Sequence, residues 1–204
     1  YAKIGFSTSL YVRLRWFFCQ FEKIEERIPE NGVILDIGCG YGILSNLLAL
    51  KSEYRNVIGV DISKKRIDIA RKTIGSRKNI EFLQANIAEI ELKPCDAIIM
   101  SDFLHHIPYT LQEQILSKSH DKLSEDGILL IKEMDKEPFW KFKISYILDK
   151  LLNPQNRLYH QSSHELRELL ESIGFDMKKT SIHEGTPFTD VIYECRKKRG
   201  SEIV

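Results

Sequence analysis

Hydrophobic residues along the chain form short apolar runs that alternate with helical repeats. The runs predict buried strands beginning at Val33, Val57, Ile80, Cys95 and Ile128. Strands that alternate with helices favour a parallel sheet with crossover helices. Residues 175–182 and 189–195 predict two further strands, joined through Gly185, Thr186 and Pro187 as an antiparallel hairpin. The pattern therefore predicts an α/β fold whose mostly parallel sheet ends in an antiparallel hairpin.

Two helical segments fall outside this alternation. Within residues 1–30, one helix is predicted with an apolar face at Leu10, Leu14, Phe17, Phe21, Ile24 and Ile28, and it should end at Pro29. Residues 136–160 form a helical insertion after the fifth strand, rich in Trp, Phe and Lys, with a break at Asn153 and Pro154. Both segments favour either a cover helix on the sheet or a surface that closes over a ligand or touches lipid.

Composition sets the class of protein. The 204 residues fit a single domain spanning 1–204, and 43% hydrophobic with 29% charged residues is typical of a globular protein. A formal charge of +1 gives no general reason to expect nucleic-acid binding. The four cysteines contain no C-x-x-C pair, and neither a signal peptide nor a membrane-spanning run is visible. We expect a cytoplasmic protein with reduced thiols.

A glycine-rich turn follows the first strand. The segment 35–42 reads LDIGCGYG and leads into an apolar helical repeat, which predicts a strand, a loop and a helix. Glycines let the backbone approach a ligand closely, and the N-terminus of the helix attracts an anion. The dinucleotide fingerprint is not met, because Ile43 stands where its third glycine belongs and Asp36 would repel a pyrophosphate. A nicotinamide-dependent oxidoreductase is therefore disfavoured.

This segment resembles motif I of the class I S-adenosylmethionine-dependent methyltransferases, and the resemblance extends over nearly the whole chain. It implies a Rossmann-like three-layer sandwich with a seven-stranded sheet, and S-adenosyl-L-methionine as the cofactor. It also implies that the loop residues Gly38, Cys39 and Gly40 hold the amino-acid end of the cofactor, which Asp36 orients through the loop.

Further cofactor contacts are expected at the ends of the next strands. Asp61 ends the second strand 21 positions after Gly40, where an acid can accept hydrogen bonds from ribose hydroxyls. Ile62 is a candidate wall for the adenine ring. The family commonly has an aspartate at the position of Asn86, whose carbonyl could still accept a bond from the adenine amino group; the alternative is a simple turn residue. Ile87 is a further residue expected to contact the cofactor.

The segment after the fourth strand is expected to face the reaction, because ligands of parallel sheets bind at the carboxyl ends of strands. Its LHHIP run at 104–108 resembles the motif IV region of small-molecule and lipid methyltransferases, which implies that Ser101 and Asp102 line the cofactor or the substrate. His105 or His106 could act as a general base, and the alternative is a packed, hydrogen-bonded histidine. No nearby cysteine or glutamate completes a metal site, so no metal is expected.

We therefore predict a methyltransferase that acts on a small-molecule or lipid-like acceptor by in-line transfer. Candidate acceptor contacts are Tyr11, Asp102, Trp140, Tyr159 and His160. Nucleic acid is not an expected partner, because an N-P-P-Y type signature is absent after the fourth strand. Peripheral contact with a membrane is possible, and the oligomeric state is open. The alternative function is a non-catalytic cofactor-binding module that supports a partner subunit through the aromatic N-terminal face.

Overall fold

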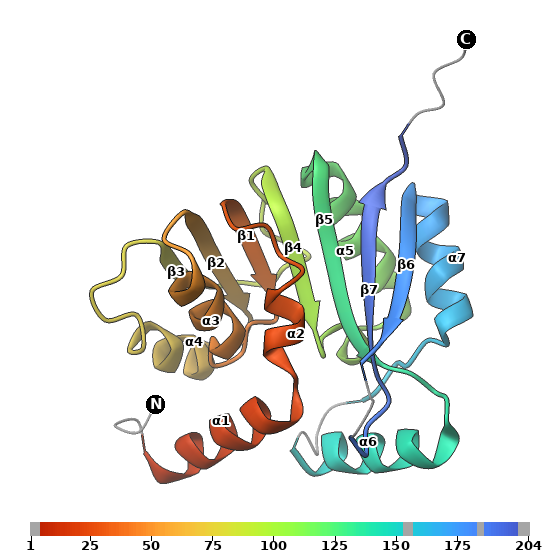
Figure 1. Cartoon of the computed structure of the whole chain (residues 1–204), viewed down its shortest axis with the longest axis horizontal. Helices are drawn as coiled ribbons and strands as arrows, with labels where there is room; N and C mark the ends of the chain where they lie inside the picture. The colour runs from red at the N-terminus through yellow and green to blue at the C-terminus, as the bar shows by residue number, and fades with distance from the viewer. Residues whose placement is uncertain (1–4, 153–156, 183–185, 200–204) are drawn as a thin grey trace. The chain divides into compact units, whose positions relative to one another are not determined.

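The computed structural model describes residues 5–152, 157–182 and 186–199. The strands are β1 (Gly32–Ile37), β2 (Arg55–Asp61), β3 (Ile80–Gln84), β4 (Cys95–Ser101), β5 (Leu123–Met134), β6 (Phe175–Ser181) and β7 (Asp190–Lys197). They form a seven-stranded sheet in the order β3-β2-β1-β4-β5-β7-β6, shown in Figure 1. This confirms the predicted mostly parallel sheet with an antiparallel end.

Helices flank the sheet. They are α1 (Phe6–Phe18), α2 (Phe21–Glu25), α3 (Ile43–Lys51), α4 (Lys64–Arg71), α5 (Tyr109–Lys122), α6 (Phe139–Leu152) and α7 (Ser163–Ile173), with a short 3-10 turn, η1 (Leu104–His106). Among the described residues, no helix is long and apolar enough to cross a membrane. The chain divides into two compact units, Tyr1–Ile99 and Met100–Val204.

In the first unit, β2 runs parallel to both β1 and β3. Ile34 of β1 pairs with Val57 of β2, and both side chains are fully buried. Helices α3 and α4 pack on β2 and β3. Ser63 caps α4 by accepting a hydrogen bond from the N–H of Arg66, as its position before the helix predicts. Strands buried on both faces explain why the sequence shows continuous apolar runs there.

The single N-terminal helix predicted over residues 10–28 is wrong. The chain forms two helices, α1 and α2, separated at Gln20, whose φ of 46° is left-handed and cannot continue an α-helix. Phe21 and Ile24 in α2 are buried as expected, whereas Leu14 and Phe17 in α1 are exposed. The apolar spacing runs through the break, so periodicity alone did not reveal it.

In the second unit, β7 runs antiparallel to both β5 and β6, which confirms the predicted hairpin. Ser162 forms a capping box at the start of α7, and Gly174 ends that helix with a left-handed φ of 112°. The strand predicted to begin at Ile128 begins earlier, since β5 starts at Leu123 and includes residues 125–127. Arg196 of β7 donates to the carbonyl of Asp126, and this contact helps hold the segment extended.

Two predicted features fall outside the described residues. They are the helix break at Asn153 and Pro154, and Gly185 in the loop of the hairpin.

Candidate functional site

The loop between β1 and α3 has an unusual backbone. Gly38, Gly40 and Gly42 have φ values of 75°, 55° and 75°, which L-residues with side chains rarely adopt. The N–H groups of Gly38 and Cys39 both donate to the carbonyl of Val60 at 2.8 and 3.1 Å, so the loop is fastened to β2. The alternating glycines predicted to form a tight turn therefore do so.

Gly40 and Gly42 serve different purposes. A Cβ on Gly42 would lie 2.4 Å from the ring of Phe82, so this glycine is needed for packing inside the unit. A Cβ on Gly40 would meet nothing within 4 Å, so this side of the loop is open to a ligand. Among the described residues, no side chain caps the first turn of α3, which leaves its N-terminus suited to an anionic group.

Asp61 joins the loop to the end of β2. Its Oδ2 accepts the N–H of Gly40 at 3.0 Å, and its Oδ1 accepts the N–H of Ser63 at 2.8 Å. Arg66 lies 3.8 Å from the same carboxylate, which is 6% exposed. Each carboxylate oxygen has a second lone pair, so Asp61 can still accept hydrogen bonds from a diol such as ribose. Asp61 is thus held in one orientation at the end of β2, and its contact with ribose stays a prediction.

Asp36 lies deeper in the unit. It is 2% exposed and accepts a hydrogen bond from the hydroxyl of Ser45 in α3. Burial raises the pKa of Asp36 to about 6, a shift that the Ser45 hydrogen bond opposes. Asp36 therefore links the end of β1 to α3, and its indirect role toward the cofactor stays a prediction.

The remaining candidates in the first unit differ in position. Ile62 is 67% exposed and free to line a ring, whereas Ile87 is buried. Burial raises the pKa of the Cys39 thiol well above its usual range, so the thiol is neutral. Asn86 accepts the N–H of Ala88 at 3.2 Å through Oδ1 and donates to Glu89 at 2.7 Å. These bonds hold Asn86 in a turn, and its Oδ1 keeps a second lone pair that can accept a further hydrogen bond.

Tyr11 is the point at which α1 meets the glycine loop. Its ring lies edge-on to that of Tyr41, with ring centroids 5.2 Å apart. Desolvation raises the pKa of Tyr11, so its hydroxyl is neutral and can donate a hydrogen bond. Tyr11 therefore lies on the side of α1 that meets the glycine loop, and a closing role for this helix stays a prediction.

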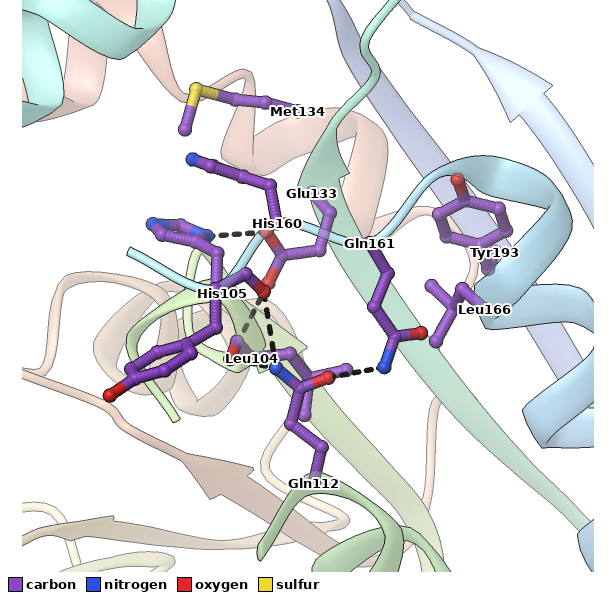
Figure 2. A pocket seen from close by; sticks show the side chains of 10 residues that line it. Leu104, His105, Gln112, Glu133, Met134, His160, Gln161, Leu166 and Tyr193 are labelled. Carbon is purple, nitrogen blue, oxygen red and sulfur yellow. Dashed lines mark hydrogen bonds and ion pairs between the residues drawn. The ribbon is translucent and has the colours of Figure 1, made fainter. Parts of the chain in front are cut away.

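In the second unit, the centre of the candidate site is His105. The side chain is 3% exposed, and its Nδ1 lies in hydrogen-bond contact with the Oε2 of Glu133, as Figure 2 shows. The other oxygen of Glu133 accepts the N–H groups of Phe103 and Leu104 at 3.2 and 2.8 Å. Glu133 therefore fixes both the ring of His105 and the backbone that carries it.

Neighbouring rings hold His105 from the side. His160 stacks on it with centroids 4.9 Å apart and planes 15° apart, and the ring of His106 lies 4.1 Å away. The N–H of Tyr159 donates to the carbonyl of His105 at 2.7 Å. The structure thus brings together four of the predicted residues, and it assigns Tyr159 and His160 to the support of His105.

A small cavity lies beside this cluster, with a volume of about 20 Å³. Its walls include Glu133, Gln161 and Tyr193, and Figure 2 shows the Gln161 amide directed at Gln112, to which it donates at 2.7 Å. Gln112 in turn donates to the carbonyl of Leu104 at 3.0 Å. The volume suits about one water molecule. The cavity is therefore too small for an organic acceptor.

Asp102 lies in a separate ion cluster. Lys132 is 3% exposed and contacts Asp102 and Asp190, each at 2.7 Å. Asp102 has a left-handed φ of 51°, and its N–H donates to the carbonyl of Lys132 at 2.9 Å. Such a buried pair is costly to break on one side. Asp102 therefore stabilises the loop after β4, in addition to any contact it makes with a ligand.

Two other predicted residues are placed differently. The buried hydroxyl of Ser101 has no hydrogen-bond partner within the described part of the chain, which is compatible with a ligand contact. Trp140 is 60% exposed on α6 and does not join the cluster around His105. Among the described residues, no group of three His, Cys, Asp or Glu side chains could hold a metal ion.

The sequence analysis missed Glu133, Lys132 and Gln112. Lys132 and Glu133 were included in the buried fifth strand without a role. Two charged residues at the end of an otherwise apolar run are expensive to bury unless they are paired, and that was the available indication. Gln112 lies on a helix and carried no such indication.

Comparison with known proteins identifies the family. A family model described as "Methyltransferase domain" matches residues 16–180. A malonyl-[acyl-carrier protein] O-methyltransferase of Halalkalibacterium halodurans is 23% identical over 172 residues, which are 80% of this chain and 62% of the relative. A carboxy-S-adenosyl-L-methionine synthase of Psychrobacter arcticus is 32% identical over 120 residues, which are 56% of this chain and 46% of the relative. The chain thus spans less than two thirds of these relatives.

Solved structures share the fold. The magnesium protoporphyrin IX methyltransferase of Synechocystis PCC 6803, solved with bound SAH, superposes with a TM-score of 0.65 at 18% identity, over 92% of this chain and 83% of that one. An O-methyltransferase family protein from Burkholderia thailandensis superposes with a TM-score of 0.72 at 16% identity, over 93% of this chain and 58% of that one.

Proposed function

Since the chain belongs to the class I S-adenosylmethionine-dependent methyltransferase family, we propose that it methylates a hydroxyl group of a small or lipid-like molecule. The observation that carries the choice of a hydroxyl is the buried pair of His105 and Glu133. A hydroxyl must lose its proton as it is methylated, whereas a neutral amine or thiolate needs no base. A buried, oriented imidazole is suited to that proton transfer.

The residues of the glycine loop fit the cofactor. The open side of Gly40, the uncapped start of α3 and the diol-accepting oxygens of Asp61 together suit a ligand with a carboxylate and a ribose. When bound, S-adenosylmethionine supplies a methyl group on a sulfonium, and its leaving group is neutral. The protein therefore needs to align the acceptor and exclude water rather than provide a strong electrophile, and alignment alone can contribute several kcal/mol.

His105 would act as the general base. With Glu133 accepting a proton from Nδ1, the lone pair of the neutral ring would lie on Nε2, a buried atom that the bound acceptor must reach to transfer its proton. The carboxylate of Glu133 then stabilises the imidazolium that forms. Its two backbone hydrogen bonds keep it from rotating toward the ring of another residue. Glu133 is therefore a positioning residue and His105 a catalytic residue in this proposal.

His106, Tyr159 and His160 have other roles in the proposal. Tyr159 and His160 hold His105 through a backbone hydrogen bond and a ring stack. His106 packs against His105 and is the weaker candidate base, because the contact with Glu133 orients the ring of His105. Asp102 and Tyr11 remain candidate contacts of the acceptor. A cytoplasmic location likewise stays a prediction.

The test combines binding and turnover. Calorimetric titration with S-adenosylmethionine and its demethylated product should show binding, and radiolabelled methyl transfer should be screened over small and lipid-like hydroxyl compounds. His105→Ala should lower kcat by about 10²–10⁴-fold without loss of cofactor binding. His164→Ala is the matched control, because His164 is exposed on α7. Cofactor binding with no turnover on any acceptor would instead favour a non-catalytic module.

A further inference from the structure

Helix α6 has its apolar side turned outward. Phe139, Trp140, Ile144 and Ile147 are 60%, 60%, 41% and 58% exposed. At 100° per residue these positions, together with Lys143, fall on one continuous arc of the helix. We refer to these five residues as the α6 apolar face. A helix of a globular protein normally turns such a face toward the core, so this face requires a different explanation.

The opposite side of α6 holds the helix to its own unit. Ser145 is 4% exposed, and its hydroxyl donates to the carbonyl of Lys141 at 3.3 Å. Lys141 itself is half-buried and donates to the carbonyl of Thr186 at 2.8 Å. The rings of Phe142 and Tyr146 also contact that of His160, with centroids 5.4 and 6.0 Å apart. The helix is therefore held to its own unit by Lys141 and by these two rings, while the four large apolar side chains of the α6 apolar face are exposed.

The charge on this face is cationic. Lys143 lies within the arc, with its Nζ 4.7 Å from the centre of the Phe139 ring. The α6 segment as a whole contains three lysines and one aspartate, although the whole chain has a formal charge of only +1. Exposed aromatic and aliphatic residues next to lysine are typical of helices that lie in a membrane interface.

Helix α1, in the other unit, shows the same arrangement independently. Leu10, Leu14 and Phe17 are 47%, 41% and 79% exposed, and Arg13 lies on the same arc. The helix contains two arginines and no acidic residue. Its inner side carries Tyr11, which contacts Tyr41 of the glycine loop. This helix therefore has an apolar, cationic outer side and an inner side that borders the candidate cofactor loop.

We propose that the protein binds the surface of an anionic membrane through the α6 apolar face, and that the outer side of α1 is a second surface of the same kind in the other unit. The apolar side chains would enter the boundary between headgroups and acyl chains, and Lys143 and Arg13 would meet lipid phosphates. Cationic residues on both helices favour an anionic bilayer over a neutral apolar partner. The inference goes beyond the proposed methyl transfer, because membrane binding requires neither cofactor nor turnover.

The test is co-sedimentation of the whole chain with vesicles. Vesicles of phosphatidylcholine alone are compared with vesicles in which about a quarter of the lipid is phosphatidylglycerol. The protein should bind the anionic vesicles, and salt should weaken the binding. Trp140→Ser should lower the partition coefficient about tenfold, and Lys143→Glu at least about fivefold. Leu50→Ser, at a 70% exposed position on α3, is the matched control and should bind normally.

Three results would overturn the proposal. One is a failure of the folded protein to sediment with anionic vesicles, with folding and cofactor binding checked separately. Another is equal binding to both kinds of vesicle, unaffected by Lys143→Glu. The last is a dimer in lipid-free solution that Trp140→Ser abolishes, because a second copy of the chain would then be the partner of this face.

Discussion

The hydrogen bond between Glu133 and His105 gives a sharp test of the catalytic assignment through Glu133→Gln. The Oε1 of the new amide can still accept the N–H groups of Phe103 and Leu104, which now lie 3.2 and 2.8 Å from the carboxylate. The amide nitrogen is then directed at Nδ1 of His105 and must donate to it. The ring is forced into the tautomer with its proton on Nε2, which cannot accept a proton from an acceptor.

The magnitudes separate catalysis from folding. The variant exchanges hydrogen bonds to a charged group for neutral ones, so the free energy of unfolding should fall by about 1–3 kcal/mol. The loss of an oriented general base should lower kcat by about 10²–10⁴-fold. Cofactor affinity should not change, because the glycine loop and Asp61 are unaltered. We therefore expect a large decrease in kcat, a modest decrease in stability and no change in cofactor affinity.

The assay is steady-state methyl transfer with an acceptor found in the screen, together with urea unfolding and calorimetric cofactor binding. Glu137→Gln is the matched control, since Glu137 is an exposed glutamate just beyond the end of β5. A Glu133→Gln enzyme with normal kcat would refute the role assigned to the pair. A loss of activity in proportion to the loss of folded protein would refute the role as well.

Three further predictions concern the first unit. Asp61→Asn should weaken cofactor binding about 100-fold and leave one buried N–H unpaired, whereas Asp68→Asn, an exposed acid on α4, should bind normally in calorimetry. Gly42→Ala should lower the free energy of unfolding by at least about 2 kcal/mol because its Cβ meets a buried ring, while Gly40→Ala should mainly reduce cofactor affinity. For Asp36 the raised pKa of about 6 means that the folded state holds the proton more tightly than the unfolded state. Its contribution to stability is therefore present below about pH 4 and lost as the pH rises to about 6, roughly 3 kcal/mol in all. Urea unfolding of Asp36→Asn should lack this loss, and an identical pH dependence in both proteins would contradict the assignment.

The fold and one half of the site could be predicted because their causes are local in the sequence. The glycines at 38, 40 and 42 impose a backbone that few other residues adopt, and Asp61 ends a run of buried β-branched residues. The break between α1 and α2 was missed because the left-handed residue is Gln20, and nothing in the residue type requires that conformation. Asn86 was assigned to the cofactor from the family pattern; its side chain also bonds within its own turn, and the cofactor contact stays a prediction.

The other half of the site depends on strand geometry that residue types do not reveal. Neighbouring residues of a strand point to opposite faces, so Lys132 and Glu133 at the end of β5 act on different parts of the loop after β4. Lys132 binds Asp102 near the start of that loop, and Glu133 binds His105 at its 3-10 turn. The dipeptide thus fixes the loop at two points, from the two sides of one strand. A sequence shows only that two charges end an apolar run, whereas the structure shows that each has a counterpart 28 to 30 positions earlier.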